Sequence, residues 1–449
     1  MAGARRDCRT APVVASTLKR SQRERLIDAM VTLSTQRGYH KVSIAELCSQ
    51  AGVSTETFYA QFDSKEECFL EAYVACRKRV FAQLWALAAQ SGDCSQAARL
   101  ALEELLKDLA RDPDAARLLF VEALGGGPLI RAERERTLAQ FERAIEQLLR
   151  RTPEAGKSLD VPPTAVIGAL RHIVSGHLRA HREDRLPVRL EDGLAWLCSY
   201  EVPAGSTPWS TSPAALLEGA PVTSRRAAWE PDTLPPGRHG LPAGVIARSQ
   251  RTRLIFATAE VTMAKGYQNA KISDIATAAR VTKAVFYEHF ASKEEAFLEA
   301  QRRATQYILD TCTWAYFSVD RWPQRLWRAL QRLLGLICEN PAISHLRLVE
   351  CYAAGPVAIQ RAEEITRSFT IFLEEGYYYP TRAPAPPRLA SQAVVGAISE
   401  IVQRQVERRE FATLGAHLPQ LAYVAIAPFT GAQEAIELVE RMKARELVA

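Results

Sequence analysis

The chain has 449 residues, a net charge of +6 at pH 7 and an ordinary globular composition, with 47% hydrophobic and 24% charged residues. This length is too great for one core and favours two to four domains. No apolar run reaches the roughly 18 residues of a membrane span. Nine scattered cysteines without a C-x-x-C pair argue against a zinc framework and are typical of reduced thiols in the cytoplasm. The mild positive charge permits a nucleic-acid partner without indicating one.

A segment near the N-terminus occurs twice, 228 positions apart. VSTETFYAQFDSKEECFLEAY begins at residue 53, and VTKAVFYEHFASKEEAFLEAQ begins at residue 281. The same offset relates Val121-Glu122 to Val349-Glu350 and Gly168-Ala169 to Gly396-Ala397. A repeat of this length is far longer than a solenoid period of about 20–50 residues. The chain therefore contains two copies of a whole fold.

Each copy begins with helical patterns. In the first copy, apolar residues at helical spacing predict a helix over 23–37 that stops at Gly38. A capping box formed by Ser43 and Glu46 predicts a short helix over 43–51. After a tight turn, a third helix runs through Gln61, and a second capping box opens a long helix that passes Phe81.

The rest of each copy shows helical patterns broken by Pro and Gly, and no strand alternation stands out, so we expect an all-α protein. The predicted segments are a basic arm at 1–20, a helix-turn-helix domain at 21–66, a helical regulatory domain at 67–200, a Pro-, Gly- and Ser-rich linker at 201–247, a second helix-turn-helix domain at 248–294 and a second helical domain at 295–449. Trp209 and Trp229 are candidates for holding parts of the linker against a surface.

A short helix, a turn with Gly and a second short helix form a helix-turn-helix, the motif that places one helix in the DNA major groove. Phe58 and Phe62 lie four residues apart and are expected to face the core together. The open side then carries short polar side chains of the kind that reach base edges and phosphates. Lys65 follows at a helix N-terminus, where a phosphate is favourable.

The pattern G-Y-x(4)-I-A-x(4)-A-G-V-S-x-x-T-F-Y-x-x-F-x-S-K-E resembles the DNA-binding domain of the tetracycline-repressor (TetR) family over about 60 residues of each copy. The resemblance implies a recognition helix and phosphate contacts at the start of each copy. The DNA-binding candidates of the first copy are Ser43, Ser54, Thr55, Glu56, Thr57, Tyr59, Gln61 and Lys65. Those of the second copy are Lys271, Thr282, Lys283, Ala284, Val285, Tyr287, His289 and Lys293.

The two copies differ at positions that matter for reading DNA. Arg280 replaces the glycine of the turn, Lys271 replaces the capping serine, and Val285 replaces a threonine that faces the bases. Glu56 in the first copy is unfavourable near phosphates, although it can accept from a cytosine amino group. We therefore expect the copies to read different bases. The alternatives are that one copy is degenerate and serves pairing or sensing, or that the protein is a helical binding module without DNA binding.

The resemblance to the TetR family implies a two-fold dimer. Two unlike copies in one chain therefore predict a single-chain pseudo-dimer, in which the two copies pair with each other. Its expected partner is a double-stranded DNA operator with two unlike half-sites. The expected pairing surfaces are the last helices, about 164–182 with 191–200 against 391–409 with 418–427. A homodimer of whole chains stays open. The predicted role is that of a ligand-responsive repressor.

The resemblance also implies an effector pocket in the helical domains, for an apolar or aromatic small molecule. The aromatic candidates for its lining are Trp85, Phe120, Trp314, Phe317, Trp327 and Tyr352, with ordinary core packing as the alternative. His177 and His181 have a metal-binding spacing, but no carboxylate or cysteine partner is placed beside them, so neither a metal nor a cofactor is predicted. No nucleophile–base or phosphate-loop motif is present, and we predict no enzyme activity.

Overall fold

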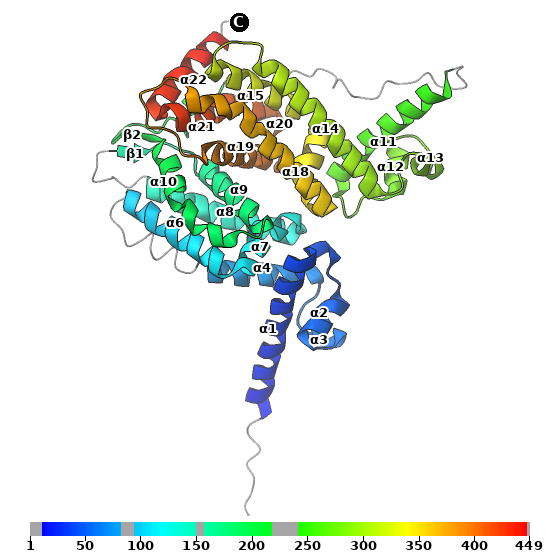
Figure 1. The fold of residues 1–449 in the computed structure, drawn as a ribbon. Coiled ribbons are helices and arrows are strands. Elements are labelled where there is room, and N and C mark those ends of the chain that lie inside the picture. Colours follow the sequence, from blue (N-terminus) through cyan, green and yellow to red (C-terminus); the bar gives the residue numbers. More distant parts are fainter. Residues whose placement is uncertain (1–10, 82–93, 150–156, 218–240, 447–449) are drawn as a thin grey trace, which may run out of the picture.

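The computed structural model describes residues 11–81, 94–149, 157–217 and 241–446, and almost all of its regular structure is helical (Figure 1). The first unit begins with a head of α1 (Ala11–Arg37), η1 (Tyr39–Lys41), α2 (Ile44–Ala51) and α3 (Thr55–Tyr59). The first body follows, with α4 (Lys65–Phe81), α6 (Cys94–Arg111), α7 (Pro113–Phe120), η2 (Glu122–Gly125), α8 (Pro128–Leu149), α9 (Pro163–Arg179), η3 (Glu183–Arg185), η4 (Pro187–Arg189) and α10 (Leu190–Cys198).

The second unit repeats this order. Its head contains α11 (Ala243–Lys265), α12 (Ile272–Ala278) and α13 (Lys283–His289). The second body contains α14 (Lys293–Tyr316), α15 (Trp322–Glu339), α16 (Pro341–His345), the π-helical turn η6 (Leu346–Glu350), α17 (Cys351–Ala354), α18 (Pro356–Ser368), η7 (Phe369–Tyr378), α19 (Ala390–Glu407), α20 (Phe411–Leu414), η8 (Gly415–His417), α21 (Leu418–Thr430) and α22 (Ala432–Glu446). The predicted all-α fold is confirmed.

The structure adds one short ladder to this helical fold. Strands β1 (Lys157–Leu159) and β2 (Glu201–Pro203) pair antiparallel, with Ser158 opposite Val202. The sequence showed no strand alternation at these positions, because strands of three residues are too short to show an alternating pattern. A 3-10 turn, η5 (Pro213–Ala215), follows the second strand.

The beginning of the expected linker at 201–247 is part of the fold. The indole of Trp209 donates to Glu440 of α22 at 2.9 Å and packs on the ring of Tyr423, with ring centroids 5.2 Å apart. The backbone N–H groups of Trp209 and Ser210 both donate to the carboxylate of Asp160. Trp209 therefore holds this segment against the second body, as its sequence context suggested, whereas Trp229 lies outside the described residues.

The last part of the predicted arm and the last part of the predicted linker are also helical. Helix α1 begins at Ala11, well inside the expected arm at 1–20, and α11 begins at Ala243, inside the expected linker. Residues 11–20 contain no glycine, and their one proline falls in the first turn, where a missing N–H costs nothing. The helix can therefore start earlier than its amphipathic pattern does.

The two units pair through α9 and α19, and two glycines at equivalent positions set their closest approach. A Cβ atom on Gly168 would lie 2.6 Å from the carbonyl oxygen of Gly396, and a Cβ atom on Gly396 would lie 2.8 Å from the carbonyl oxygen of Gly168. Since these residues are 228 positions apart, a pseudo-two-fold axis passes between them. Figure 1 shows α9 and α19 side by side at the middle of the molecule.

Aromatic side chains extend this contact at the far end from the heads. The hydroxyl of Tyr200 donates to the carbonyl of Val424 at 2.9 Å, and the hydroxyl of Tyr423 donates to the carbonyl of Asp160 at 2.6 Å. Both tyrosine rings are fully buried. The pairing therefore joins α9 and the end of the first unit to α19 and α21, as the sequence predicted for these segments.

The charged part of the pairing surface is not symmetric. Glu400 of α19 is fully buried and lies 2.6 Å from Arg171 of α9, with Arg404 and Arg134 at 3.2 and 3.7 Å. Burial by itself would raise the pKa of this carboxyl, but the three guanidinium groups hold it at about 2. The equivalent position in the first unit is His172, which is not a carboxylate. The central ion cluster therefore exists only once.

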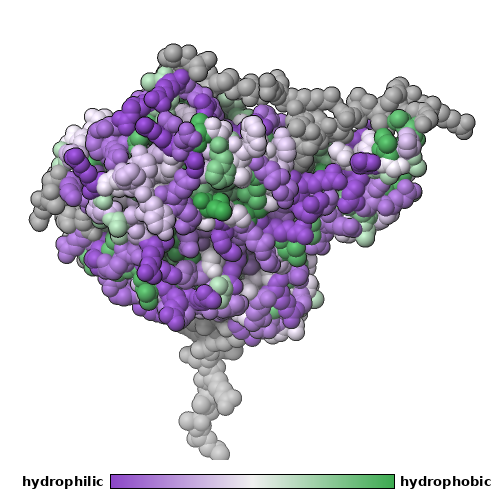
Figure 2. Space-filling view, turned by 45° about the horizontal axis from the view of Figure 1, so that its top comes forward, coloured by the Kyte–Doolittle hydropathy of each residue, from purple (hydrophilic) through white to green (hydrophobic). Residues whose placement is uncertain are grey.

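Both heads project from the paired bodies, the first below them and the second to their right in Figure 1. The face of the molecule in Figure 2 is largely hydrophilic, with apolar side chains gathered in a patch near its centre. Within the residues that the structure describes, no helix combines the length and apolarity needed to span a lipid bilayer.

The glycine contact predicts a sharp difference between two substitutions on α9. Gly168→Ala places a methyl group against backbone atoms of α19 that cannot rotate away, and we expect it to lower stability by about 1–3 kcal/mol. Gly176→Ala on the same helix meets nothing within 4 Å. It should raise stability by roughly 0.5–1 kcal/mol, because alanine restricts the unfolded chain. Thermal unfolding measures both effects. If the two melting temperatures moved in the same direction, the predicted role of the glycine contact would be contradicted.

Burial of His345 predicts loss of stability in mild acid. His345 is 6% exposed, and burial, followed by repulsion from Arg409 and Arg131, lowers its pKa to about 4. Between pH 6.5 and 4 the unfolded chain binds a proton that the folded protein does not, so stability falls as pH falls, by about 1–3 kcal/mol at pH 4.5. Urea unfolding at pH 7.5 and 4.5 should show a smaller loss for His345→Gln than for the unchanged protein. An equal loss would contradict the prediction.

Candidate nucleic-acid interface

The first head is a helix-turn-helix whose two short helices are both capped. The hydroxyl of Ser43 accepts from the N–H of Glu46 at 3.2 Å, and the Glu46 carboxylate accepts from the N–H of Ser43 at 2.9 Å. This confirms the predicted capping box at the start of α2. Gly52 ends that helix with φ of 62°, a left-handed conformation that glycine adopts at little cost.

Helix α3 presents one apolar face to the core and one polar face to solvent. Ser54 caps the helix by accepting from the N–H of Thr57 at 3.1 Å. Phe58 and Phe62 are fully buried, as their spacing predicted, and their rings lie 5.7 Å apart. The side chains that point away from this core are the predicted DNA-binding residues.

The outward face of α3 is exposed to solvent. Ser54, Thr55 and Glu56 are exposed, Thr57 is half-buried, and the ring of Tyr59 is 56% exposed. Tyr59 is the last residue of the helix, and Ser54, Thr55 and Glu56 lie at its N-terminal end. This is the end from which a recognition helix contacts bases.

The second head has the same frame with different surface chemistry. Thr282 caps α13, and Phe286 and Phe290 are buried in place of the first head's phenylalanines. Tyr287 is 57% exposed, almost the same as its counterpart. The outward residues are Thr282, Lys283, Ala284 and the half-buried Val285. Relative to the first head, Lys283 therefore replaces Thr55, Ala284 replaces Glu56 and Val285 replaces Thr57.

The turn of the second head tolerates its arginine at a cost. Arg280 occupies the place of Gly52 and adopts φ of 55°, in the left-handed region that a side chain disfavours. The N–H of Val281 still bonds the Ala276 carbonyl at 2.9 Å, as the N–H of Val53 bonds the Cys48 carbonyl in the first head. The backbone of the turn is thus the same in both heads.

Lys65 and Lys293 are held by backbone carbonyls of their own heads. The ammonium of Lys65 donates to the carbonyls of Tyr39 and Val42, at 3.3 and 2.9 Å, and lies over the Tyr39 ring. Lys293 bonds Tyr267 and Ala270 in the same way. Each ammonium has three donors, so one is left for a phosphate. These lysines fix α4 and α14 to the preceding turns, and their phosphate contact stays a prediction.

Three other candidates lie at the edges of the heads. Lys271 is exposed at the start of α12 and does not replace the hydroxyl cap that Ser43 supplies. Gln61 is half-buried beyond α3. The ring of His289 lies 3.3 Å from the amide oxygen of Gln250. Burial, followed by repulsion from Arg251, lowers the pKa of His289.

Two glutamates that were not among the candidates connect each head to its body. Glu122 accepts from the N–H of Tyr39 at 3.0 Å, and Glu350 accepts from the N–H of Tyr267 at 2.7 Å. Both carboxylates reach the turn that follows the first helix of a head. The sequence held a signal for them, because Val121-Glu122 recurs as Val349-Glu350 at the repeat offset.

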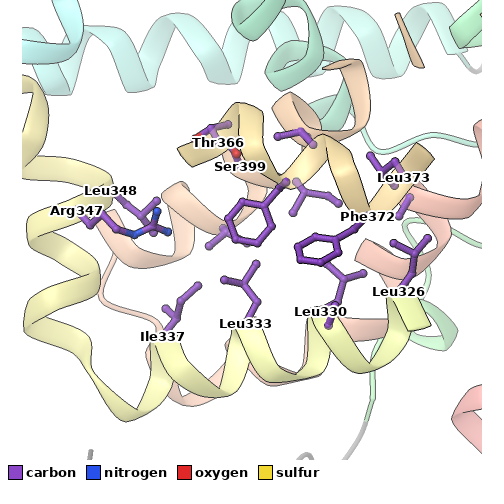
Figure 3. Close-up of a pocket in the computed structure, with 16 residues that line it drawn as sticks. Leu326, Leu330, Leu333, Ile337, Arg347, Leu348, Thr366, Phe372, Leu373 and Ser399 are labelled. Carbon is purple, nitrogen blue, oxygen red and sulfur yellow. The ribbon is translucent and has the colours of Figure 1, made fainter. Parts of the chain in front are cut away.

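Each body contains a cavity between equivalent helices. The first has a volume of about 200 Å³ and the second, shown in Figure 3, about 70 Å³. At the repeat offset, Phe372 in the lining of the second corresponds to Ala144 in the lining of the first. Equivalent lining positions include Leu102 and Leu330, Leu105 and Leu333, Phe120 and Leu348, and Phe141 and Phe369.

The predicted pocket residues divide between these cavities, the core and the surface. Phe120 lines the first cavity. Trp314 and Phe317 are 82% and 64% exposed, a correction to the expectation, because their side of α14 faces solvent. Trp327 is in the core, and Tyr352 lines a separate small space at the pairing surface. Trp85 lies outside the described residues.

Comparison with known proteins identifies the heads. The family model for bacterial regulatory proteins of the tetR family matches residues 26–72 and 254–300. The HTH-type transcriptional regulator YdgC of Bacillus subtilis is 30% identical over 102 residues, which are 22% of this chain and 52% of that protein, so the match spans about half of its length. The nucleoid occlusion factor SlmA of Shewanella loihica is 22% identical over 167 residues, 37% of this chain and 85% of that protein.

Among solved structures, the transcriptional regulator FadR from Bacillus subtilis in complex with stearoyl-CoA is 17% identical, covers 41% of this chain and 99% of its own, and has a TM-score of 0.35. The match to SlmA covers a length of chain close to that of one unit. Both heads are therefore DNA-binding domains of the tetR family of bacterial transcriptional regulators, and this chain carries that domain twice in tandem.

Proposed function

We propose that the protein is a sequence-specific, ligand-responsive repressor in which one chain supplies both heads to an operator with two unlike half-sites. The observation that carries the proposal is the pairing of α9 with α19 across a pseudo-two-fold axis. Two-fold pairing of helix-turn-helix heads is the arrangement that reads two half-sites about one turn of DNA apart.

Unlike half-sites follow from the unlike outward faces. The first head offers hydroxyls and the carboxylate of Glu56, which can accept from a cytosine amino group. The second offers the ammonium of Lys283, which suits guanine or a phosphate, and Val285, which suits a thymine methyl. Since the helices are held in the same frame, these side chains meet the same part of each half-site and favour different bases there.

The single ion cluster favours pairing between unlike units over pairing between like ones. Glu400 satisfies Arg171 and Arg134 of the first unit. Two first units placed together would bring these guanidiniums to the axis without Glu400. Two second units would bury two copies of Glu400, each with Arg404 of its own helix but without Arg171 and Arg134. Because a buried charge that has lost its partners is costly, both like pairings are disfavoured.

A response to a ligand requires that the cavities communicate with the heads. Glu122 and Glu350 hold the turns of the heads. Glu122 lies just after α7, and Glu350 is the last residue of η6. Other residues of α7 and η6 line the first and the second cavity, respectively. A ligand that fits one arrangement of these helices better than another shifts the heads toward that arrangement. The spacing of the heads, and with it the affinity for DNA, then depends on the ligand.

A second candidate function is a protein in which only the first head binds DNA. The strained conformation of Arg280 and the missing hydroxyl cap at Lys271 favour it. The buried Phe286 and Phe290 and the retained turn hydrogen bonds support two working heads instead. Substitutions in one head at a time distinguish the two functions.

The first test is selection of bound DNA from a random library by the full chain. We expect an enriched site with two different halves, with centres about 34–36 Å apart along the duplex. Light scattering of the complex with this site should give the mass of one chain per duplex. A palindromic site, or two chains on one site, would contradict the single-chain arrangement.

Substitutions in the heads should act on one half-site each. Thr57→Ala should relax sequence preference in one half and Lys283→Ala should weaken the other, each by about 1–3 kcal/mol of binding free energy. Lys107→Ala, on the exposed side of α6 away from both heads, is the control and should leave binding unchanged. If Thr57→Ala acts and Lys283→Ala has no effect on any half, the second head is degenerate.

A further inference from the structure

Arg347 is a buried charge without a partner. Its side chain is 5% exposed, and its Nε atom is completely buried. Among the residues that the structure describes, none forms a hydrogen bond or an ion pair with this guanidinium. Burial lowers its pKa, but an arginine side chain keeps its charge in proteins. Because an unpaired buried charge is costly, the binding of an anion beside this guanidinium would be favourable.

The guanidinium lies at one end of the cavity in the second body. Figure 3 shows Arg347 directed along the cavity toward Phe372, with Ile337, Leu333 and Leu330 of α15 in that order along the lower wall. Thr366 and Ser399 are the other polar residues of the lining, and the remainder is apolar. No carboxylate belongs to the lining among the described residues. The cavity therefore combines one cationic end with a long apolar wall.

The local backbone that positions Arg347 is unusual. Leu346–Glu350 forms a π-helical turn, which is rare and frequently marks a functional site. The equivalent position in the first unit is Leu119, in the ordinary α-helix α7, and it too lines a cavity. The first cavity therefore has no charge at this position, and the two arginines in its lining, Arg134 and Arg171, both pair with Glu400.

We propose that the second cavity binds short straight-chain monocarboxylates, butyrate to octanoate, with the carboxylate paired to Arg347 and the chain along Leu330, Leu333 and Phe372. This deepens, and rests on, the ligand response in the proposed function. A planar guanidinium binds a carboxylate through two parallel hydrogen bonds, which gives both affinity and orientation. The volume of about 70 Å³ is small beside ordinary ligand pockets of roughly 300–1,000 Å³, so short chains are selected.

The same guanidinium also lies beside the pairing surface. Arg347, Thr366 and Ser399 line a second small space together with Arg171, Gln403 and Glu363, and the carboxylate of Glu363 pairs with Arg179. Arg171 in turn contacts Gln403 and Glu400. A carboxylate that neutralises Arg347 therefore changes the electrostatic field at the ion cluster that joins the two units. This gives the ligand a physical route to the relative position of the heads.

Isothermal titration of the full chain with butyrate, hexanoate and octanoate tests the assignment. We expect one site per chain, binding of hexanoate, and at least tenfold weaker binding of hexanamide, which has the same shape without the charge. Arg347→Leu installs the residue type of the first unit and should weaken hexanoate at least tenfold. Arg328→Leu, on the more exposed side of the same α15 wall, is the control and should bind hexanoate normally.

The assignment is overturned if hexanoate does not bind, if hexanamide binds equally well, or if Arg347→Leu binds as the unchanged protein does. Misfolding of the variant is checked by its melting temperature, which should not fall, because the substitution removes an unpaired buried charge. The selected operator provides an independent readout. If the Arg347→Leu variant no longer binds hexanoate but still binds both half-sites, the ligand assignment is separated from DNA recognition. If DNA selection fails while hexanoate still binds, the result counts only against the proposed function.

Discussion

The close approach of α9 and α19 at Gly168 and Gly396 is the constraint on which the arrangement of the molecule depends. Each glycine faces the backbone carbonyl of the other, so no side chain larger than hydrogen fits at either position. The contact brings Arg171 within reach of Glu400 and lets Tyr200 and Tyr423 bond across the pairing surface. The position of both heads then follows, because each is fixed to its body through a lysine and a glutamate that the repeat retains.

The two heads share the contacts that hold their helices together, but differ in the side chains that they present to solvent. Arg23 and Arg251 bond equivalent carbonyls and lie over equivalent phenylalanines, at 4.3 and 4.5 Å from the ring centroids of Phe62 and Phe290. The outward residues of α3 and α13 share little beyond the exposed tyrosine. The bodies follow the same rule, since the two cavities lie between equivalent helices but differ in volume and charge. A duplicated frame with diverged surfaces supports two different tasks within one chain.

Much of this could be predicted from the sequence, because heads and pairing helices carry local signals. Capping boxes and the spacing of Phe58 and Phe62 depend on neighbours in the chain, and Gly168-Ala169 could be noticed because it recurs at the repeat offset. The aromatic pocket could not be predicted in this way. Whether Trp314 or Phe372 faces a cavity depends on which side of a helix meets distant segments, and composition does not contain that information. The missing partner of Arg347 is likewise a property of the packed structure, and so is the attachment of Trp209 to α22.

The covalent union of the two units has a consequence for how occupancy depends on the amount of protein. A regulator that must first dimerise forms its active species in proportion to the square of its concentration when it is dilute. Here both halves of the paired body belong to one molecule, and dilution does not separate them. Under the proposed arrangement, the fraction of operator that is bound rises with the first power of the number of chains. The response to gene dosage is then graded, and a few molecules per cell retain the same structure as many.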